Sequence, residues 1–225
     1  MDSWFPLAIT SPYLSDILCL AGSIALLVLY HLYLAWRLRR DPHYTVQAVH
    51  AEARAAWVES VMAKGRDILA VQTLRNSTMA ATFFASTAVL LIIGVLSLSG
   101  QSSALGTNWH ALNLFGATDS ALWLVKLLCL IVDLCVAFFS FALAVRKYNH
   151  VGYLINLPSG FDHPVVTPRY VAAYLNRAGR TYTLGMRAYY FLLPLVFWLF
   201  GPHLMLGAAV VLVFALYRLD RSTEE

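Results

Sequence analysis

The stretch Ala121–Val145, ALWLVKLLCLIVDLCVAFFSFALAV, decides the fold class because only two of its residues are charged. A helix rises about 1.5 Å per residue, and the hydrocarbon layer of a bilayer is about 30 Å thick, so about 20 apolar residues are enough to cross it. Backbone N–H and C=O groups in lipid must pair within their own segment, and the run is too long for a barrel strand. The stretch therefore predicts a membrane-spanning helix.

Three further apolar runs have the length of a membrane span: Pro12–Trp36, Met79–Leu98 and Ala188–Tyr217. Of the 225 residues, 60% are hydrophobic and 12% are charged, whereas a soluble domain has about 45–50% and about 25%. We therefore predict an all-α integral membrane protein with four transmembrane helices. Without repeats or long linkers, residues 1–225 should form a single membrane domain.

The run Ala188–Tyr217 allows two interpretations, because Phe200-Gly201-Pro202 lies in its middle. As one helix it would be about 45 Å long, bent at Gly201-Pro202 and projecting beyond the membrane. As a re-entrant hairpin it would have two arms, each too short to span. We expect the single bent span, although the hairpin would place Arg218 and Arg221 on the more favourable side.

Most of the basic residues lie in two segments between the predicted spans. Residues 37–76 hold seven Lys or Arg and residues 146–187 hold six, while residues 1–36 and 77–118 hold none. Basic residues near helix ends stay in the cytoplasm. We therefore expect an inner-membrane protein with two cytoplasmic loops, 37–76 and 146–187, and an outside N-terminus. The loops should contain amphipathic helices at Tyr44–Lys64 and Arg169–Leu184, and no basic patch suggests nucleic-acid binding.

The third span carries Lys126 and Asp133, which together cost about 5–7 kcal/mol at mid-membrane and should face protein or water. Their seven-residue spacing places them on one helix face together with Ser140. Asp16 lies near the outer end of the first span, at a depth where it could pair with Lys126. The stripe indicates either the lining of an ion or proton path or a helix–helix seam.

Polar residues elsewhere support weaker hypotheses. Gln72, Arg75 and Asn76 form a polar mouth where anions could meet the start of the second span, or simply precede a tightly packed small-residue helix. His31 and His150 are candidate proton carriers or ligands of a bis-His haem, or structural histidines. No metal-ligand spacing and no catalytic motif is present, so we expect no metal and no enzyme.

Several stretches resemble the domain-of-unknown-function 599 family. The similarity covers most of the chain, and it implies a multipass membrane protein with no settled activity. Asp133 lies outside the family pattern, whereas Lys126 and Asn149 match it. The stretches that carry the resemblance are Tyr30-His31-Leu32, Ala70–Ala80, Ala85-Ser86-Thr87, Arg187–Tyr190, Pro194-Leu195, Trp198–Pro202 and Tyr217–Asp220.

Three functions from different classes fit these features. The first is an oligomeric channel or transporter for a small ion, since four spans seldom enclose a path alone. The second is a structural or accessory subunit of a larger membrane complex, and the third is a haem-binding redox protein. The partners expected in each case are the lipid bilayer and either further copies of the chain or other subunits.

Overall fold

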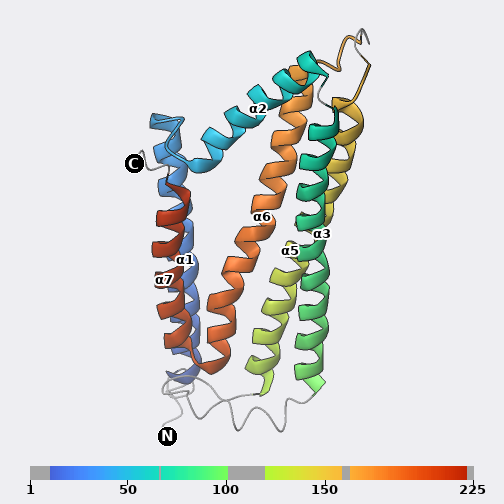
Figure 1. The fold of residues 1–225 in the computed structure, drawn as a ribbon. Coiled ribbons are helices and arrows are strands. Elements are labelled where there is room, and N and C mark those ends of the chain that lie inside the picture. The colour runs from blue at the N-terminus through green and yellow to red at the C-terminus, as the bar shows by residue number, and fades with distance from the viewer. Residues whose placement is uncertain (1–10, 66, 101–119, 159–162, 222–225) are drawn as a thin grey trace, which may run out of the picture. The chain divides into compact units, whose positions relative to one another are not determined.

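The computed structural model describes residues 11–65, 67–100, 120–158 and 163–221. These residues form six helices and no β-strand, which confirms the all-α prediction (Figure 1). The helices are α1 (Ser11–Arg40), α2 (Val46–Lys64), α3 (Asp67–Gly100), α5 (Ser120–Ile155), α6 (Pro168–Phe200) and α7 (Pro202–Asp220).

Five of these helices, all except α2, are long and apolar enough to cross a membrane. The expected number was four, and the difference arises in the last apolar run. There the prediction of one long helix bent at Gly201-Pro202 is wrong, because α6 ends at Phe200 and α7 begins at Pro202. The residue before a proline is disfavoured in the helical region, and proline is favoured as the first helical residue, so the break falls at Gly201.

The chain folds back at this break, and the end of α6 packs along α7 (Figure 1). Tyr190 and Phe191 of α6 pack against a cluster that contains Leu212 and Leu216 of α7. Within the apolar run alone, each arm of the hairpin is too short to span a membrane. In the structure the first arm is 33 residues long, because α6 begins at Pro168, far upstream of the apolar run. Pro194 lies inside α6 without ending it.

Helices also occupy much of the two segments predicted as loops. α3, α5 and α6 have 34, 36 and 33 residues, or about 50 Å each, well beyond the hydrocarbon thickness. They extend their apolar runs into residues 37–76 and 146–187. Asn76 therefore lies inside α3 and not at its start, so the prediction that anions meet a helix N-terminus there is wrong.

The predicted helix at Tyr44–Lys64 is present as α2. Thr45 caps it, because its side chain accepts a hydrogen bond from the backbone N–H of Ala48 at 3.3 Å. Such a cap satisfies one of the free amides of the first turn. The helix ends at Lys64, and the next residue, Gly65, caps it with a left-handed φ of 58°, a conformation that favours glycine.

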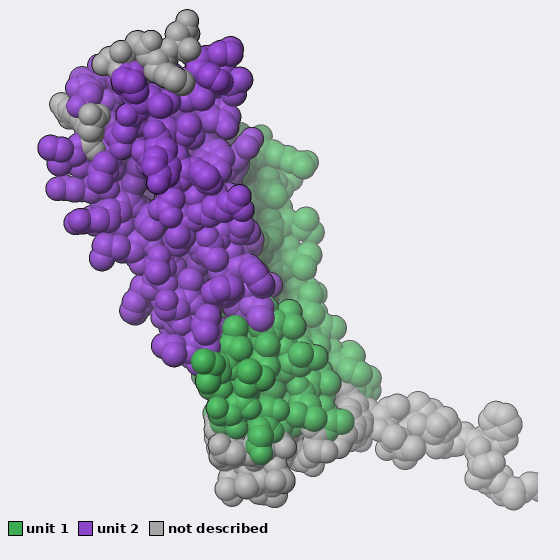
Figure 2. Space-filling model, turned by 90° about the vertical axis from the view of Figure 1, so that its right-hand side faces the viewer, with its two compact units in different colours: residues 1–40, 92–133, 189–219 green, residues 41–91, 134–188, 220–225 purple. Residues whose placement is uncertain are grey.

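The chain packs as two compact units, which Figure 2 shows in different colours. Unit 1 comprises residues 1–40, 92–133 and 189–219. One of its clusters contains Trp123, Leu127 and Leu130 of α5 with Leu199 of α6. Another joins Tyr30 of α1 to the end of α7.

Helices α1 and α7 run parallel within unit 1. A Cβ atom at Gly22 would lie 3.6 Å from Leu206 Cδ1, and further along both helices Tyr30 packs with Leu212 and Leu216. The last turns of both helices, with the basic residues of α1 and Arg218 of α7, therefore lie at the same end of unit 1.

Unit 2 comprises residues 41–91, 134–188 and 220–225, and polar contacts attach α2 to α6 within it. Arg54 Nε donates to Asn176 Oδ1 at 2.7 Å, and Asn176 Nδ2 donates to the carbonyl of Ala51 at 3.0 Å. Burial lowers the pKa of the Arg54 guanidinium from its ordinary value; Tyr148 opposes this effect and Arg180 adds to it. Polar side chains thus attach the helix that is too polar to enter lipid.

An aromatic cluster joins α3, α5 and α6 within unit 2. The Phe84 and Phe141 rings stack at 5.3 Å, and the Tyr182 ring meets Phe141 edge-on at 5.4 Å. Gly185 leaves room for this cluster, since a Cβ there would lie 2.8 Å from the Phe141 ring. Elsewhere in the unit, Arg187 pairs with Asp220 at 2.8 Å.

Candidate functional site

Lys126 lies in a closed polar network in unit 1. Its ammonium nitrogen is 3.3 Å from Asp16 Oδ1, and both side chains are only 2% exposed. Trp198 Nε1 donates to the same carboxylate oxygen at 2.8 Å, and Lys126 Nζ lies 5.4 Å from the centre of the Trp198 ring. The three residues come from α5, α1 and α6, so the network joins three helices.

This network balances its own charge. A buried charge is costly unless a counter-charge and hydrogen bonds compensate it, and here Asp16 and Trp198 supply both. The pairing of Lys126 with Asp16, expected from their depth, is thus present. The surroundings favour the helix–helix seam over the ion path for this part of the stripe.

The part of the stripe that follows Lys126 along α5, from Asp133 to Ala144, has different surroundings. Asp133 is half-buried, and its Oδ2 atom is buried without a hydrogen-bond partner among the described residues. Ser140, Ala137 and Ala144 are all buried, so this face of α5 is a packed face. Asp133 therefore differs from Lys126 in having no observed partner for one of its polar atoms.

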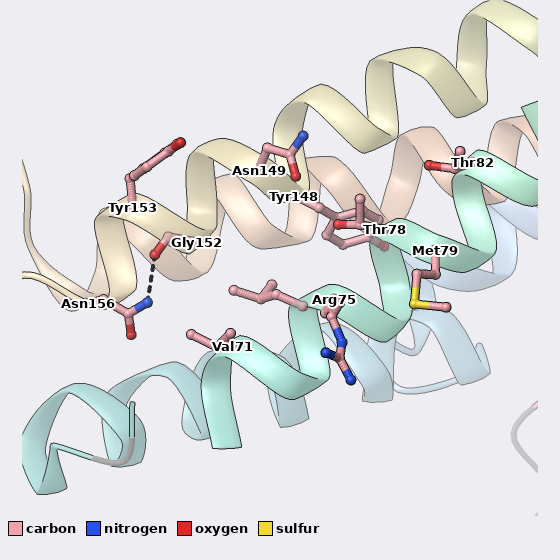
Figure 3. Close-up of a pocket in the computed structure, with 11 residues that line it drawn as sticks. Val71, Arg75, Thr78, Met79, Thr82, Tyr148, Asn149, Gly152, Tyr153 and Asn156 are labelled. Atoms are coloured by element: carbon pink, nitrogen blue, oxygen red, sulfur yellow. Dashed lines mark hydrogen bonds between the residues drawn. The ribbon is translucent and has the colours of Figure 1, made fainter. Parts of the chain in front are cut away.

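A groove of about 880 Å³ lies between α3 and α5 within unit 2 (Figure 3). Its walls come from the first half of α3 and the last third of α5, which are antiparallel. We call it the Arg75 groove, and it is lined by Val71, Leu74, Arg75, Thr78, Met79, Thr82, Tyr148, Asn149, Gly152, Tyr153 and Asn156.

The Arg75 groove holds polar groups that no other described residue engages. Arg75, on the α3 wall, is exposed and makes no hydrogen bond or ion pair with any described residue. Asn149, on the α5 wall, likewise has no polar partner in the described part of the chain. Asn156 uses its amide nitrogen on the Gly152 carbonyl at 2.9 Å, which leaves its amide oxygen for a ligand. These groups could bind an anion.

Of the three residues predicted to form a polar mouth, Gln72, Arg75 and Asn76, only one lines the groove. Arg75 lines the groove, whereas Gln72 and Asn76 are exposed and lie outside its lining. His31 and His150 lie in different compact units. His31 Nδ1 is 2.7 Å from the carbonyl of Leu27 in its own helix, and the exposed His150 ring meets Tyr174. No three described His, Cys, Asp or Glu side chains gather as metal ligands would.

A family model described as "Protein of unknown function, DUF599" matches residues 18–225. The chain belongs to this family. Comparisons with curated proteins and with solved structures find no match. The family assignment, together with the five long apolar helices, makes the chain a multipass membrane protein of the DUF599 family.

The stretches that carry the DUF599 resemblance are brought together in the structure. Trp198 contacts the Lys126–Asp16 pair, and Arg187 binds Asp220 from a stretch more than 30 residues away. Arg75 and Asn149 line one groove. Sequence reasoning missed Trp198 as a hydrogen-bond donor and Asn149 as a groove residue. The available signal was that both lie in, or match, the family pattern.

Proposed function

We propose that this DUF599 protein binds an anion, and that the Arg75 groove is its binding site. The observation that supports the proposal is a guanidinium group without an ion pair to any described residue, on the wall of a groove of about 880 Å³. Arginine is suited to carboxylate and phosphate groups because it presents several N–H donors in a planar fork. In Figure 3 the Arg75 side chain extends from α3 away from α5, so it would turn toward the groove to share an anion with Asn149 on the other wall.

We keep the predicted ion transport in this proposal, but with a different residue in contact with the ion. The charge that meets the ion is Arg75, since Asp16 balances the charge of Lys126. A groove that is open along its side encloses no path, so translocation requires a second copy to cover it. This is the reason for proposing a homo-oligomer. We further propose the inner membrane as its location, with the basic helix ends in the cytoplasm and the N-terminus outside.

Anion-dependent stability of the purified protein tests the binding site. A ligand that binds only the folded state raises the melting temperature. We expect phosphate or sulfate to raise Tm above the value in chloride at equal ionic strength, and Arg75→Gln to remove this difference. Arg146→Gln is the matched control, because Arg146 is exposed on α5 and outside the groove. An equal anion effect in wild type and Arg75→Gln would refute the proposal.

A further inference from the structure

A second cavity adjoins the Arg75 groove along the same pair of helices. It measures about 550 Å³ and lies in unit 2, and Thr82 lines both cavities. We call it the Phe138 groove. Apart from Thr82 and Ser86 it is lined by apolar side chains, and its residues are Thr82, Ala85, Ser86, Val89, Leu90, Phe138, Ala142 and Val145.

The depth of the polar end matches a lipid headgroup. Arg75 precedes the apolar run that begins at Met79 by four residues, and Asn149 follows the run that ends at Val145 by four. Four helical residues span about 6 Å, and the headgroup zone extends about 5–7 Å beyond the hydrocarbon. Both helices independently place their polar residue at this level. Tyr153, 79% exposed, lies near it, as interfacial tyrosines do.

The Phe138 groove lies at the depth of acyl chains. On α3 it extends from Thr82 to Leu90, which is about 12 Å along the helix and falls inside the apolar run. On α5 it extends from Val145 back to Phe138, over a similar length. The two grooves together therefore change from polar to apolar in the direction in which a phospholipid does.

From this match we infer that the two grooves hold one anionic phospholipid, with its phosphate at Arg75 and Asn149 and an acyl chain in the Phe138 groove. The inference rests on the proposed anion site and names its ligand class. A free anion would leave the Phe138 groove without an occupant.

Native mass spectrometry in mild detergent tests the inference, with phosphatidylglycerol and phosphatidylcholine as the probes. We expect the wild type to prefer phosphatidylglycerol by about fivefold, the effect of one basic residue near an anionic lipid. Arg75→Gln should lose this preference, and Arg146→Gln should keep it. Ser86→Phe, which fills the Phe138 groove, should reduce binding of both lipids. Leu91→Phe adds bulk outside the groove and should leave binding unchanged.

The possible failures are distinguishable. If phosphate still stabilises the protein through Arg75 but Ser86→Phe binds lipid like the wild type, the lipid inference is wrong and the anion site stands. If Arg75→Gln keeps both the lipid preference and the phosphate effect, both proposals are wrong. A second copy that covers the Arg75 groove is compatible with a lipid in the Phe138 groove. If a cysteine at position 86 crosslinks two copies at high yield and added phosphatidylglycerol does not lower that yield, a second chain occupies the Phe138 groove and the lipid inference is wrong.

Discussion

Two carboxylates in membrane-spanning helices have opposite surroundings. Asp16 forms an ion pair with Lys126 and accepts a hydrogen bond from Trp198. Asp133, in contrast, has a buried oxygen without a hydrogen-bond partner among the described residues. In sequence the two look alike, since each is a single acidic residue in an apolar run. Their replacement should therefore have opposite consequences.

Breaking the buried pair should destabilise the protein. Lys126→Met leaves Asp16 charged and buried, which costs about 3–5 kcal/mol. The double variant Lys126→Met/Asp16→Leu removes both charges and should recover most of that loss, because replacing a buried pair by apolar residues is often neutral. Thermal unfolding in detergent measures both effects. A double variant no more stable than the single one would contradict this account.

Asp133→Asn should leave stability unchanged or raise it, because the half-buried carboxylate has no observed partner to lose and the substitution removes its charge. Asp16→Asn is the matched control and should lower stability. The same unfolding measurement compares the two. Equal destabilisation by both replacements would mean that Asp133 has a partner, such as a second copy of the chain.

The sequence predicted the site residues only where depth alone was sufficient. Lys126 and Asp16 lie at similar depths in their apolar runs, so their pairing could be expected. The contribution of Trp198 could not, because its position depends on where α6 begins and on the fold-back at Gly201. The placement of Arg75 and Asn149 in the lining of one groove depends on the register of two antiparallel helices, which residue spacing within either helix does not contain.

At the scale of helices, apolar runs predicted where lipid is crossed but not where helices end. α3, α5 and α6 continue for several turns beyond their runs because a helix in water needs no apolar residues, only backbone pairing and packing. For the same reason α6 was not predicted as a separate span. Its first 20 residues are polar on one side, so the apolar run marks only its last part. Residue composition thus indicates which part of a helix crosses lipid, and packing determines where the helix ends.

The contact between α5 and α6 in unit 2 depends on a glycine. Gly185→Ala places a methyl group within 3.0 Å of Phe141, whose ring is fully buried and held by Phe84 and Tyr182. Overpacking of this kind costs about 1–3 kcal/mol. Gly94→Ala, in open space on α3, should stabilise the helix by about 0.5–1 kcal/mol. Unfolding midpoints that fall equally for both variants would refute the steric explanation.

At the scale of the whole chain, the number of crossings determines where the termini lie. Four crossings place both termini on one side, whereas five place them on opposite sides. Within unit 1 the parallel course of α1 and α7 places Arg218 at the end that holds the basic last turn of α1. The hairpin thus satisfies the positive-inside rule that the single bent span violated.

A reporter fused to the C-terminus tests the five-span topology. If the N-terminus is outside, a C-terminal fusion to green fluorescent protein should fluoresce, and one to alkaline phosphatase should be inactive. Fusions after residue 100, at the end of α3, serve as the control and should behave in the opposite way, since two crossings precede them. Phosphatase activity at the C-terminus would require an even number of crossings.

The difference in exposure between Lys126 and Arg75 has a further consequence for ionic strength. The Debye length falls from about 10 Å at 0.1 M salt to about 3 Å at 1 M, but mobile ions screen only charges that they can approach. The Lys126–Asp16 pair, 2% exposed on both sides, is out of their reach, while Arg75 is not. Concentrated sodium chloride should therefore weaken the attraction of ligands to the groove and leave the helix-joining network intact.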